Sequence, residues 1–226
     1  LSPNPSYPIH PYGFIIAGAS LRHLPAMDEG IFNPDLYLER LENSIKDSVP
    51  APVALIVSFP SNPTAQVVSL EFYKELVKIA LKYNVYILSD LAYAEIYYDD
   101  IKPPSILEVS RAKEVAVEFT SMSKTYAMAG WRIGFAVGNT KLIYALTRIK
   151  SYLDYGAFTP VQVAAASALN GPQSCVEDIR NTYQRRRDVF ITSMASSGWD
   201  IPKPQASMFA WAPLPEKYKS KGSLEF

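Results

Sequence analysis

Short runs of apolar and β-branched side chains recur along the first two thirds of the chain, and they predict buried strands. Residues 53–59 form an unbroken run of this kind, as expected of a strand that is covered on both faces of a sheet. A second run occupies 85–90 and a third occupies 115–119. Residues 132–138 indicate one further strand.

The segment between the first two runs has helical periodicity instead. Ser69 can cap a helix that continues to about Tyr83, where Asn84 ends it. Four apolar side chains share one face of this helix: Tyr73, Leu76, Val77 and Ala80. Strand, helix and strand at this spacing predict a parallel α/β sheet with crossover helices.

Helical patterns dominate the last third of the chain. Thr140 can cap one helix, and Pro160 begins a short alanine-rich helix that ends near Gly171. A long polar helix follows over 176–196, and we interpret its arginine triplet, 185–187, as a solvated face.

Prolines punctuate the segment after this long helix, so we place a domain boundary at its end. We predict a large α/β domain over residues 1–197 and the beginning of a smaller α+β domain over 198–226. Because the chain starts at Leu1 and an apolar pattern resumes at its other end, we expect it to be part of a longer protein.

Composition narrows the class of protein. Apolar residues make up 48% of the 226 residues and charged residues 19%, which is typical of a globular protein. The formal net charge is zero, which argues against nucleic acid as a partner. The longest uncharged apolar stretch, 13–21, is too short to span a bilayer, so we expect no membrane association. Cys175 is the only cysteine, which favours a reducing, cytoplasmic compartment.

Polar side chains gather where the predicted strands end. Each of them alone has an ordinary explanation as a turn residue, a helix cap, a packed aromatic or a solvated cation. Ligands in open parallel sheets bind beyond the carboxyl ends of the strands, and these residues follow three consecutive ends. They are Asn62, Asp90, Tyr93, Ser121, Ser123 and Lys124, with Arg132 a little further along.

Three segments resemble the class I/II aminotransferases, fold-type I enzymes that depend on pyridoxal 5′-phosphate. They are Phe-Pro-Ser-Asn-Pro-Thr at 59–64, Ser-Asp-Leu-Ala-Tyr at 89–93, and the block from Ser121-Met-Ser-Lys124 to Gly130-Trp-Arg132-Ile-Gly134. The resemblance covers most of the chain and is closest to the alanine and LL-diaminopimelate aminotransferase branch. It implies a three-layer α/β/α domain with a mostly parallel sheet, and a homodimer.

The resemblance also implies a role for each of these residues. Lys124 matches the lysine that forms a Schiff base with the cofactor and then moves a proton of the substrate. Asp90 matches the carboxylate that pairs with the pyridine nitrogen and keeps the ring an electron sink. Asn62 and Tyr93 match the two donors to the ring hydroxylate.

The remaining matches concern the phosphate and the ring face. Ser121, Ser123 and Arg132 match the phosphate cradle, where the planar fork of an arginine meets phosphate oxygens in pairs. Tyr7 matches the aromatic that stacks on the cofactor ring. The arginine that holds the substrate α-carboxylate is expected beyond Phe226.

The resemblance therefore implies an aminotransferase that moves an amino group from an alanine-, aspartate- or diaminopimelate-like amino acid to a 2-oxo acid such as 2-oxoglutarate. Two alternatives remain open: a carbon–sulfur β-lyase that uses the same site, and a non-catalytic cofactor-sensing domain. No metal is expected, because His10 and His23 are interpreted as loop histidines without a second metal ligand at useful spacing.

Overall fold

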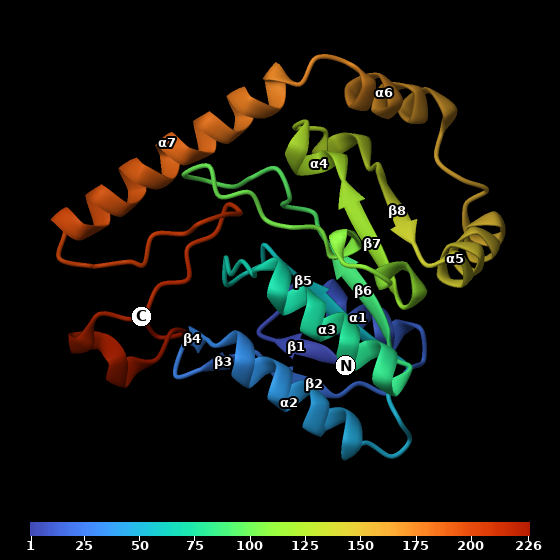
Figure 1. Cartoon of the computed structure of the whole chain (residues 1–226). Helices are drawn as coiled ribbons and strands as arrows, with labels where there is room; N and C mark the ends of the chain where they lie inside the picture. The colour runs from blue at the N-terminus through green and yellow to red at the C-terminus, as the bar shows by residue number, and fades with distance from the viewer.

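A four-stranded sheet forms the centre of the computed structural model, which describes residues 1–226 (Figure 1). Its strands follow one another in chain order: β5 (Ala54–Ser58), β6 (Tyr86–Asp90), β7 (Ala116–Ser121) and β8 (Gly134–Gly138). The first three are parallel, and β8 runs antiparallel to β7. The predicted α/β class with a mostly parallel sheet is confirmed.

The register of the strands brings their polar ends to one edge. Asp90 lies opposite Ser58 of β5 and opposite Phe119 of β7. Since β8 is antiparallel, it begins at this same edge, with Gly134 opposite Ser121. A Cβ at Gly134 would lie 2.5 Å from the carbonyl oxygen of Thr120, so only glycine allows the two strands to approach this closely.

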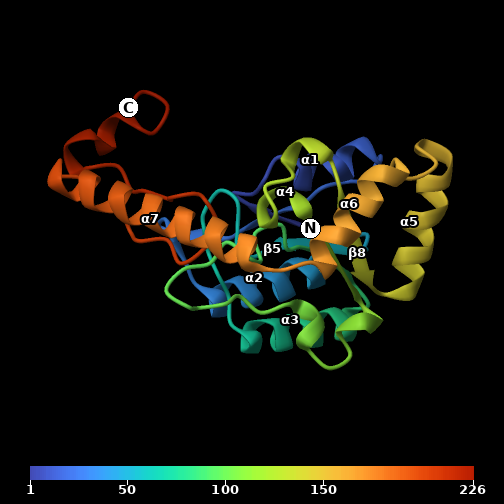
Figure 2. The same cartoon turned by 90° about the horizontal axis from the view of Figure 1, so that it is seen from above.

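Two amphipathic helices, α2 (Pro34–Lys46) and α3 (Leu70–Tyr83), lie together on one side of the sheet (Figure 2). Ser69 caps α3 by accepting a hydrogen bond from the Phe72 N–H, as predicted. Asn33 caps α2 in the same way, and Pro34 follows it; this helix was not among the predicted elements.

The core lies between these helices and the sheet. All four residues predicted to share one face of α3 are buried. A cluster of aromatic rings joins α2, α3 and the end of β5, with ring centres 5.4–6.3 Å apart: Phe32, Tyr37, Phe59 and Phe72. This packing fixes the position of the segment that follows β5.

The first 32 residues form small elements around the sheet. Their bounds are β1 (Ser2–Asn4), α1 (Ile9–Ile16), β2 (His23–Pro25), β3 (Met27–Asp28) and β4 (Ile31–Phe32). Strands β1 and β2 pair in parallel, and the amino group of Leu1 donates to the carbonyl oxygen of Ala54 on β5. These contacts place α1 beside the edge of the sheet at which Asp90 lies.

Three longer helices follow the sheet: α5 (Thr140–Leu153), α6 (Thr159–Asn170) and α7 (Ser174–Ser196). The cap of α5 differs from the prediction, because Asn139 and not Thr140 accepts the hydrogen bond from the Leu142 N–H. The Asn139 amide also donates to the carbonyl oxygens of Lys113 and Glu114, which hold it at the start of the helix.

Short helices complete the chain. They are α4 (Met122–Thr125) and four 3₁₀ turns at Ile106–Glu108, Ala112–Glu114, Ala129–Trp131 and Glu216–Lys221. No helix combines the length and the apolar character needed to cross a membrane.

Two arginines hold helix α7 to the segment that follows β6. Arg180 donates to the Glu95 carboxylate, and its guanidinium carbon lies 3.9 Å from the centre of the Tyr97 ring. Arg187 forms hydrogen bonds of 2.8 and 3.0 Å with both carboxylate oxygens of Asp99.

The interpretation of residues 185–187 as a solvated face is therefore wrong for Arg187, which is 6% exposed, whereas Arg185 and Arg186 are exposed. Arg187 also donates to the carbonyl oxygen of Pro204, and the Tyr98 hydroxyl donates to that of Ser207. The chain beyond α7 thus returns to the sheet, and the domain boundary near residue 197 stays a prediction.

Candidate active site

Asp90 ends β6, and a histidine holds its carboxylate. Nε2 of His10 lies 2.8 Å from Oδ2 of Asp90, and the Ala92 N–H donates to Oδ1 over 3.1 Å. His10 is only 3% exposed and lies on α1, so its interpretation as a loop histidine is wrong. The carboxylate is thereby fixed at the edge of the sheet and keeps one open side, with 26% of its side chain exposed.

Tyr7, Asn62 and Tyr93 lie around this carboxylate. The Tyr7 ring meets the His10 ring edge-on, with ring centres 5.6 Å apart. Burial raises the pKa of Tyr93, and the negative charge of Asp90 raises it further, whereas a hydrogen bond with Asn62 acts in the opposite direction. Tyr93 is therefore a neutral phenol that can donate its proton in a hydrogen bond.

The turn after β5 presents Asn62 to this group. Ser61 and Thr64 join their hydroxyl groups over 2.6 Å, and the Gln66 N–H donates to the Ser61 hydroxyl over 2.7 Å. Because both hydroxyl groups are buried, this turn is rigid and Asn62 keeps its position.

Ser121, Ser123 and Arg132 all belong to the connection between β7 and β8. The Ser121 hydroxyl accepts a hydrogen bond from the Ser123 N–H over 3.1 Å and caps α4. The Met122 N–H donates to the carbonyl oxygen of Ile133, which fastens the two arms of the turn. Arg132 is exposed and donates only to the Ala129 carbonyl oxygen, so most of its N–H groups are available.

Lys124 lies on α4, half-buried, and its amine has no hydrogen-bond or ion-pair partner in the chain. It lines an open cavity of about 480 Å³ together with Ser123, Tyr183 and Met208. Met208 is followed by Phe209, whose ring centre lies 5.5 Å from that of Tyr93. The cavity of Lys124 thus adjoins the group around Asp90.

The structure therefore brings the predicted site residues to one edge of the sheet, in two adjoining groups. One group is Tyr7, Asn62, Asp90 and Tyr93, and the other is Ser121, Ser123, Lys124 and Arg132. Together they offer a held carboxylate, two neutral donors, an unpaired amine, and hydroxyl and guanidinium groups suited to an anion.

Sequence reasoning missed three residues of this region: His10, Tyr183 and Phe209. The Phe209 ring meets the Tyr93 ring edge-on, 5.5 Å between centres. His10 follows Tyr7 in the motif Tyr-Pro-Ile-His, and that proximity was the one signal available. For Tyr183 and Phe209 no local signal exists, because their contacts depend on how the chain after α6 returns to the sheet.

Comparison with known proteins gives a consistent result. The family described as aminotransferase class I and II matches residues 1–224. The glutamate-pyruvate aminotransferase AlaC of Escherichia coli (strain K12) is 55% identical over 226 residues, which are 100% of this chain and 54% of that protein.

More distant relatives are aminotransferases as well. An LL-diaminopimelate aminotransferase of Moorella thermoacetica is 40% identical over 230 residues, covering 100% of this chain and 56% of its own length. The structure of an aminotransferase from Staphylococcus aureus superimposes with a TM-score of 0.84 at 30% identity, over 96% of this chain and 56% of that one. The chain thus spans about half the length of the relatives that it matches.

Proposed function

This chain belongs to the class I and II aminotransferase family, whose members depend on pyridoxal 5′-phosphate, and we propose that its protein transfers an amino group from a small amino acid to a 2-oxo acid. Of the candidate donors, alanine is supported by the 55% identity to a glutamate-pyruvate aminotransferase, against 40% to an LL-diaminopimelate aminotransferase, and the former relative adds glutamate to the candidates. Aspartate-like donors have weaker support, from a solved aspartate aminotransferase of Thermus thermophilus at 26% identity.

The residues at the sheet edge fit this cofactor. A protonated pyridine nitrogen needs a carboxylate, and Asp90 is held in place by His10 with one side open. A ring hydroxylate needs hydrogen-bond donors, and Tyr93 and Asn62 provide a phenol and an amide. A phosphate needs hydroxyl and guanidinium groups of the kind that Ser121, Ser123 and Arg132 provide.

The bound cofactor supplies an electron sink for the electron pair that the substrate α-carbon keeps when it loses its proton. In our proposal Lys124 binds the cofactor covalently through Nζ and later carries that proton on the same atom. Both roles need an amine that forms no ion pair, and no carboxylate contacts Lys124.

In our proposal the other residues position the cofactor and set its protonation state. Asp90 holds a proton on the pyridine nitrogen, and His10 prevents the carboxylate from turning away. Tyr93 donates its hydroxyl proton in a hydrogen bond, since burial and the charge of Asp90 keep the phenol neutral. Tyr7 offers a flat face to the ring, and Arg132 with the two serines anchors the phosphate.

One observation carries the proposal: an unpaired lysine, Lys124, lies one turn beyond β7 in a cavity that adjoins a histidine-held carboxylate at the end of β6. We further expect a homodimer in the cytoplasm. The homodimer rests on the family alone and is tested by light scattering of the purified protein. Cytoplasmic location rests on Cys175, a single exposed thiol that suits a reducing compartment.

The test is an absorption spectrum of the full chain with added pyridoxal phosphate. A visible band should form with the wild type and with the control variant Lys141→Ala, which changes an exposed lysine in the first turn of α5, but not with Lys124→Ala. Alanine or glutamate should then bleach the band, and a 2-oxo acid should restore it.

Two results contradict the proposal. A Lys124→Ala variant with full turnover would remove the assigned lysine from the reaction. Pyruvate and ammonia formed from amino acids without any added 2-oxo acid would instead identify a β-lyase.

A further inference from the structure

Lys124 lies on a helix of a single turn, and such a helix needs contacts from outside to keep its shape. Helix α4 has only four residues, and helices this short are not stable alone in water. Its first residue is fastened, because Met122 is 1% exposed and its N–H donates to the carbonyl oxygen of Ile133. Beyond Lys124 the backbone is strained, because Ala127 has a φ of 53°, and a conformation of this kind persists only where its surroundings hold it.

Tyr126 supplies a contact at this second end. It directly follows α4, two positions after Lys124, and its hydroxyl donates to Oε1 of Gln173 over 2.8 Å. Figure 1 shows the turn of Lys124 next to the connection between α6 and α7, which contains Gln173. Burial raises the pKa of Tyr126, and the nearby Cys175 and Glu95 raise it further, although the hydrogen bond to the amide opposes this shift. The phenol is therefore neutral and remains a donor.

Gln173 can accept this hydrogen bond in one orientation only. Its Nε2 donates to the carbonyl oxygen of Gly171 over 2.7 Å and to that of Ala168 over 3.1 Å, at the end of α6. An amide NH2 group donates and does not accept, so with this group among the carbonyl oxygens the amide oxygen faces Tyr126. The contact is thus directional and needs a hydroxyl at position 126 and an acceptor at position 173.

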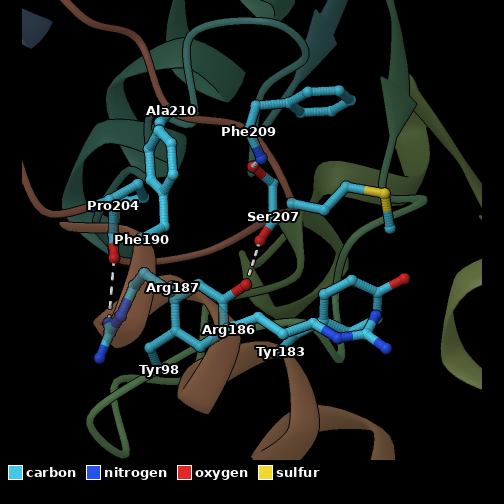
Figure 3. Close-up of a pocket in the computed structure, with 10 residues that line it drawn as sticks. Tyr98, Tyr183, Arg186, Arg187, Phe190, Pro204, Ser207, Phe209 and Ala210 are labelled. Atoms are coloured by element: carbon cyan, nitrogen blue, oxygen red, sulfur yellow. Dashed lines mark hydrogen bonds between the residues drawn. The ribbon is translucent and has the colours of Figure 1, made fainter. Parts of the chain in front are cut away.

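The helix that begins after Gln173 is itself held in place. Arg180 of α7 pairs with Glu95 over 2.9 Å. Figure 3 shows a second attachment further along α7, where the Arg187 guanidinium donates to the carbonyl oxygen of Pro204. The acceptor of the tyrosine hydroxyl therefore belongs to a part of the molecule that is fixed at several points.

We propose that Tyr126 is a positioning residue for Lys124: its hydrogen bond to Gln173 keeps the lysine amine where it meets the cofactor and the substrate α-carbon. This inference rests on the proposed function. The Tyr126 hydroxyl is occupied by Gln173, so we assign it no contact with the reacting atoms. Its loss should therefore slow the reaction and leave the binding of the amino acid nearly intact, because a small displacement of a group that carries a proton lowers the rate strongly.

The experiment compares Tyr126→Phe with Tyr83→Phe in the whole protein. Tyr83→Phe is the matched control, since it removes a tyrosine hydroxyl that donates over 2.7 Å to Glu42, between α3 and α2. We expect Tyr126→Phe to lower kcat about tenfold, the upper end of what one neutral hydrogen bond contributes, and to change the KM for the amino acid less than about twofold. Tyr83→Phe should change neither. An unchanged kcat in Tyr126→Phe, or a KM that rises as much as kcat falls, would overturn the proposal.

The variant Gln173→Met tests whether the effect passes through the hydrogen bond. Met keeps the length of the side chain and removes the acceptor. Once the acceptor is absent, Tyr126→Phe should cause no further loss, so that the kcat of the double variant equals that of Gln173→Met within about twofold. Fold-changes that multiply in the double variant would mean that the two side chains act independently, against the proposal.

Hydrogen exchange of the cofactor-free protein supplies a readout that needs no turnover. Tyr126→Phe should accelerate exchange at residues 122–128 and leave β5 and β6 unchanged, whereas Tyr83→Phe should not affect 122–128. Unchanged exchange in Tyr126→Phe would contradict its role as the anchor of this turn. Accelerated exchange at 122–128 in a protein whose wild type shows no turnover would overturn the proposed function instead.

Discussion

His10 is the side chain on which the position of Asp90 depends. It is almost fully buried, and its Nε2 is the only side-chain partner of that carboxylate. Replacing His10 by Phe would keep the volume and remove the hydrogen bond. We expect the free energy of unfolding in urea to fall by about 1–3 kcal/mol, the usual cost of leaving a partly buried polar group without its partner.

The matched variant is His10→Gln, whose side-chain N–H can reach the same oxygen. It should recover more than half of the lost stability and of the affinity for pyridoxal phosphate. If the His10→Phe and His10→Gln variants were equally stable, the hydrogen bond to Asp90 would not be what holds the carboxylate.

Glu118, in the middle of β7, carries a buried carboxylate. It is 4% exposed and accepts hydrogen bonds from the Ser105 hydroxyl and the Ile106 N–H. Burial raises its pKa above the ordinary value of 4.5, although these hydrogen bonds oppose the shift. The protonated form of Glu118 therefore stabilises the fold in full below about pH 4.5. This stabilisation is lost as the pH rises through the pKa of Glu118 in the folded state.

Glu118→Gln removes this titration. The difference in free energy of unfolding, variant minus wild type, should therefore increase between pH 4.5 and pH 8, as measured by urea denaturation at several pH values. A difference that decreases over this range would mean that the hydrogen bonds, and not burial, dominate the pKa of Glu118.

At the scale of single elements, α5 depends on the residue that caps it. Asn139 accepts from the Leu142 N–H and donates to the carbonyl oxygens of Lys113 and Glu114, and it is 7% exposed. Asn139→Ala should lower the free energy of unfolding by about 2 kcal/mol, since both the cap and two buried hydrogen bonds are lost.

Thr140→Ala is the control, because Thr140 is exposed and its side chain caps nothing. It should change stability by less than about 0.5 kcal/mol. Thermal unfolding followed by circular dichroism measures both variants, and equal losses would contradict the assignment of the cap to Asn139.

The strands and helices also show which parts of the fold can be predicted from a sequence. Strands that are covered on both faces and helices with one apolar face are visible locally, so β5, β6, β7 and α3 were predicted within one or two residues. Polar residues at strand ends were predictable for the same reason. The choice between Asn139 and Thr140 was not, because it depends on carbonyl groups 25 and 26 residues away in the chain.

At the scale of the whole molecule, the attachment of α7 to the sheet domain depends on Arg187. This guanidinium joins Asp99, Asp188 and the Pro204 carbonyl oxygen, and lies 4.4 Å from the centre of the Tyr98 ring. Because its partners lie up to 88 positions away, its burial could not be deduced from a run of three arginines.

Arg187→Leu should destabilise the protein by about 2–4 kcal/mol, since it leaves two partly exposed carboxylates facing an apolar side chain. Hydrogen exchange should accelerate at residues 203–207 and along α7 before it does in β5 and β6. Uniform acceleration throughout the chain would show that Arg187 stabilises the fold in general and does not join its two parts.

The pairing of β7 with β8 has a consequence for the length of the chain. Lys124 and Arg132 lie on one loop whose two ends are fastened together at Ser121 and Gly134. A residue inserted within this loop must displace one of the two cations, whereas an insertion in the exposed turn at 100–102 displaces neither. Natural variants should therefore differ in length at that turn and keep the number of residues between 121 and 134 constant, whatever substitutions they accumulate elsewhere.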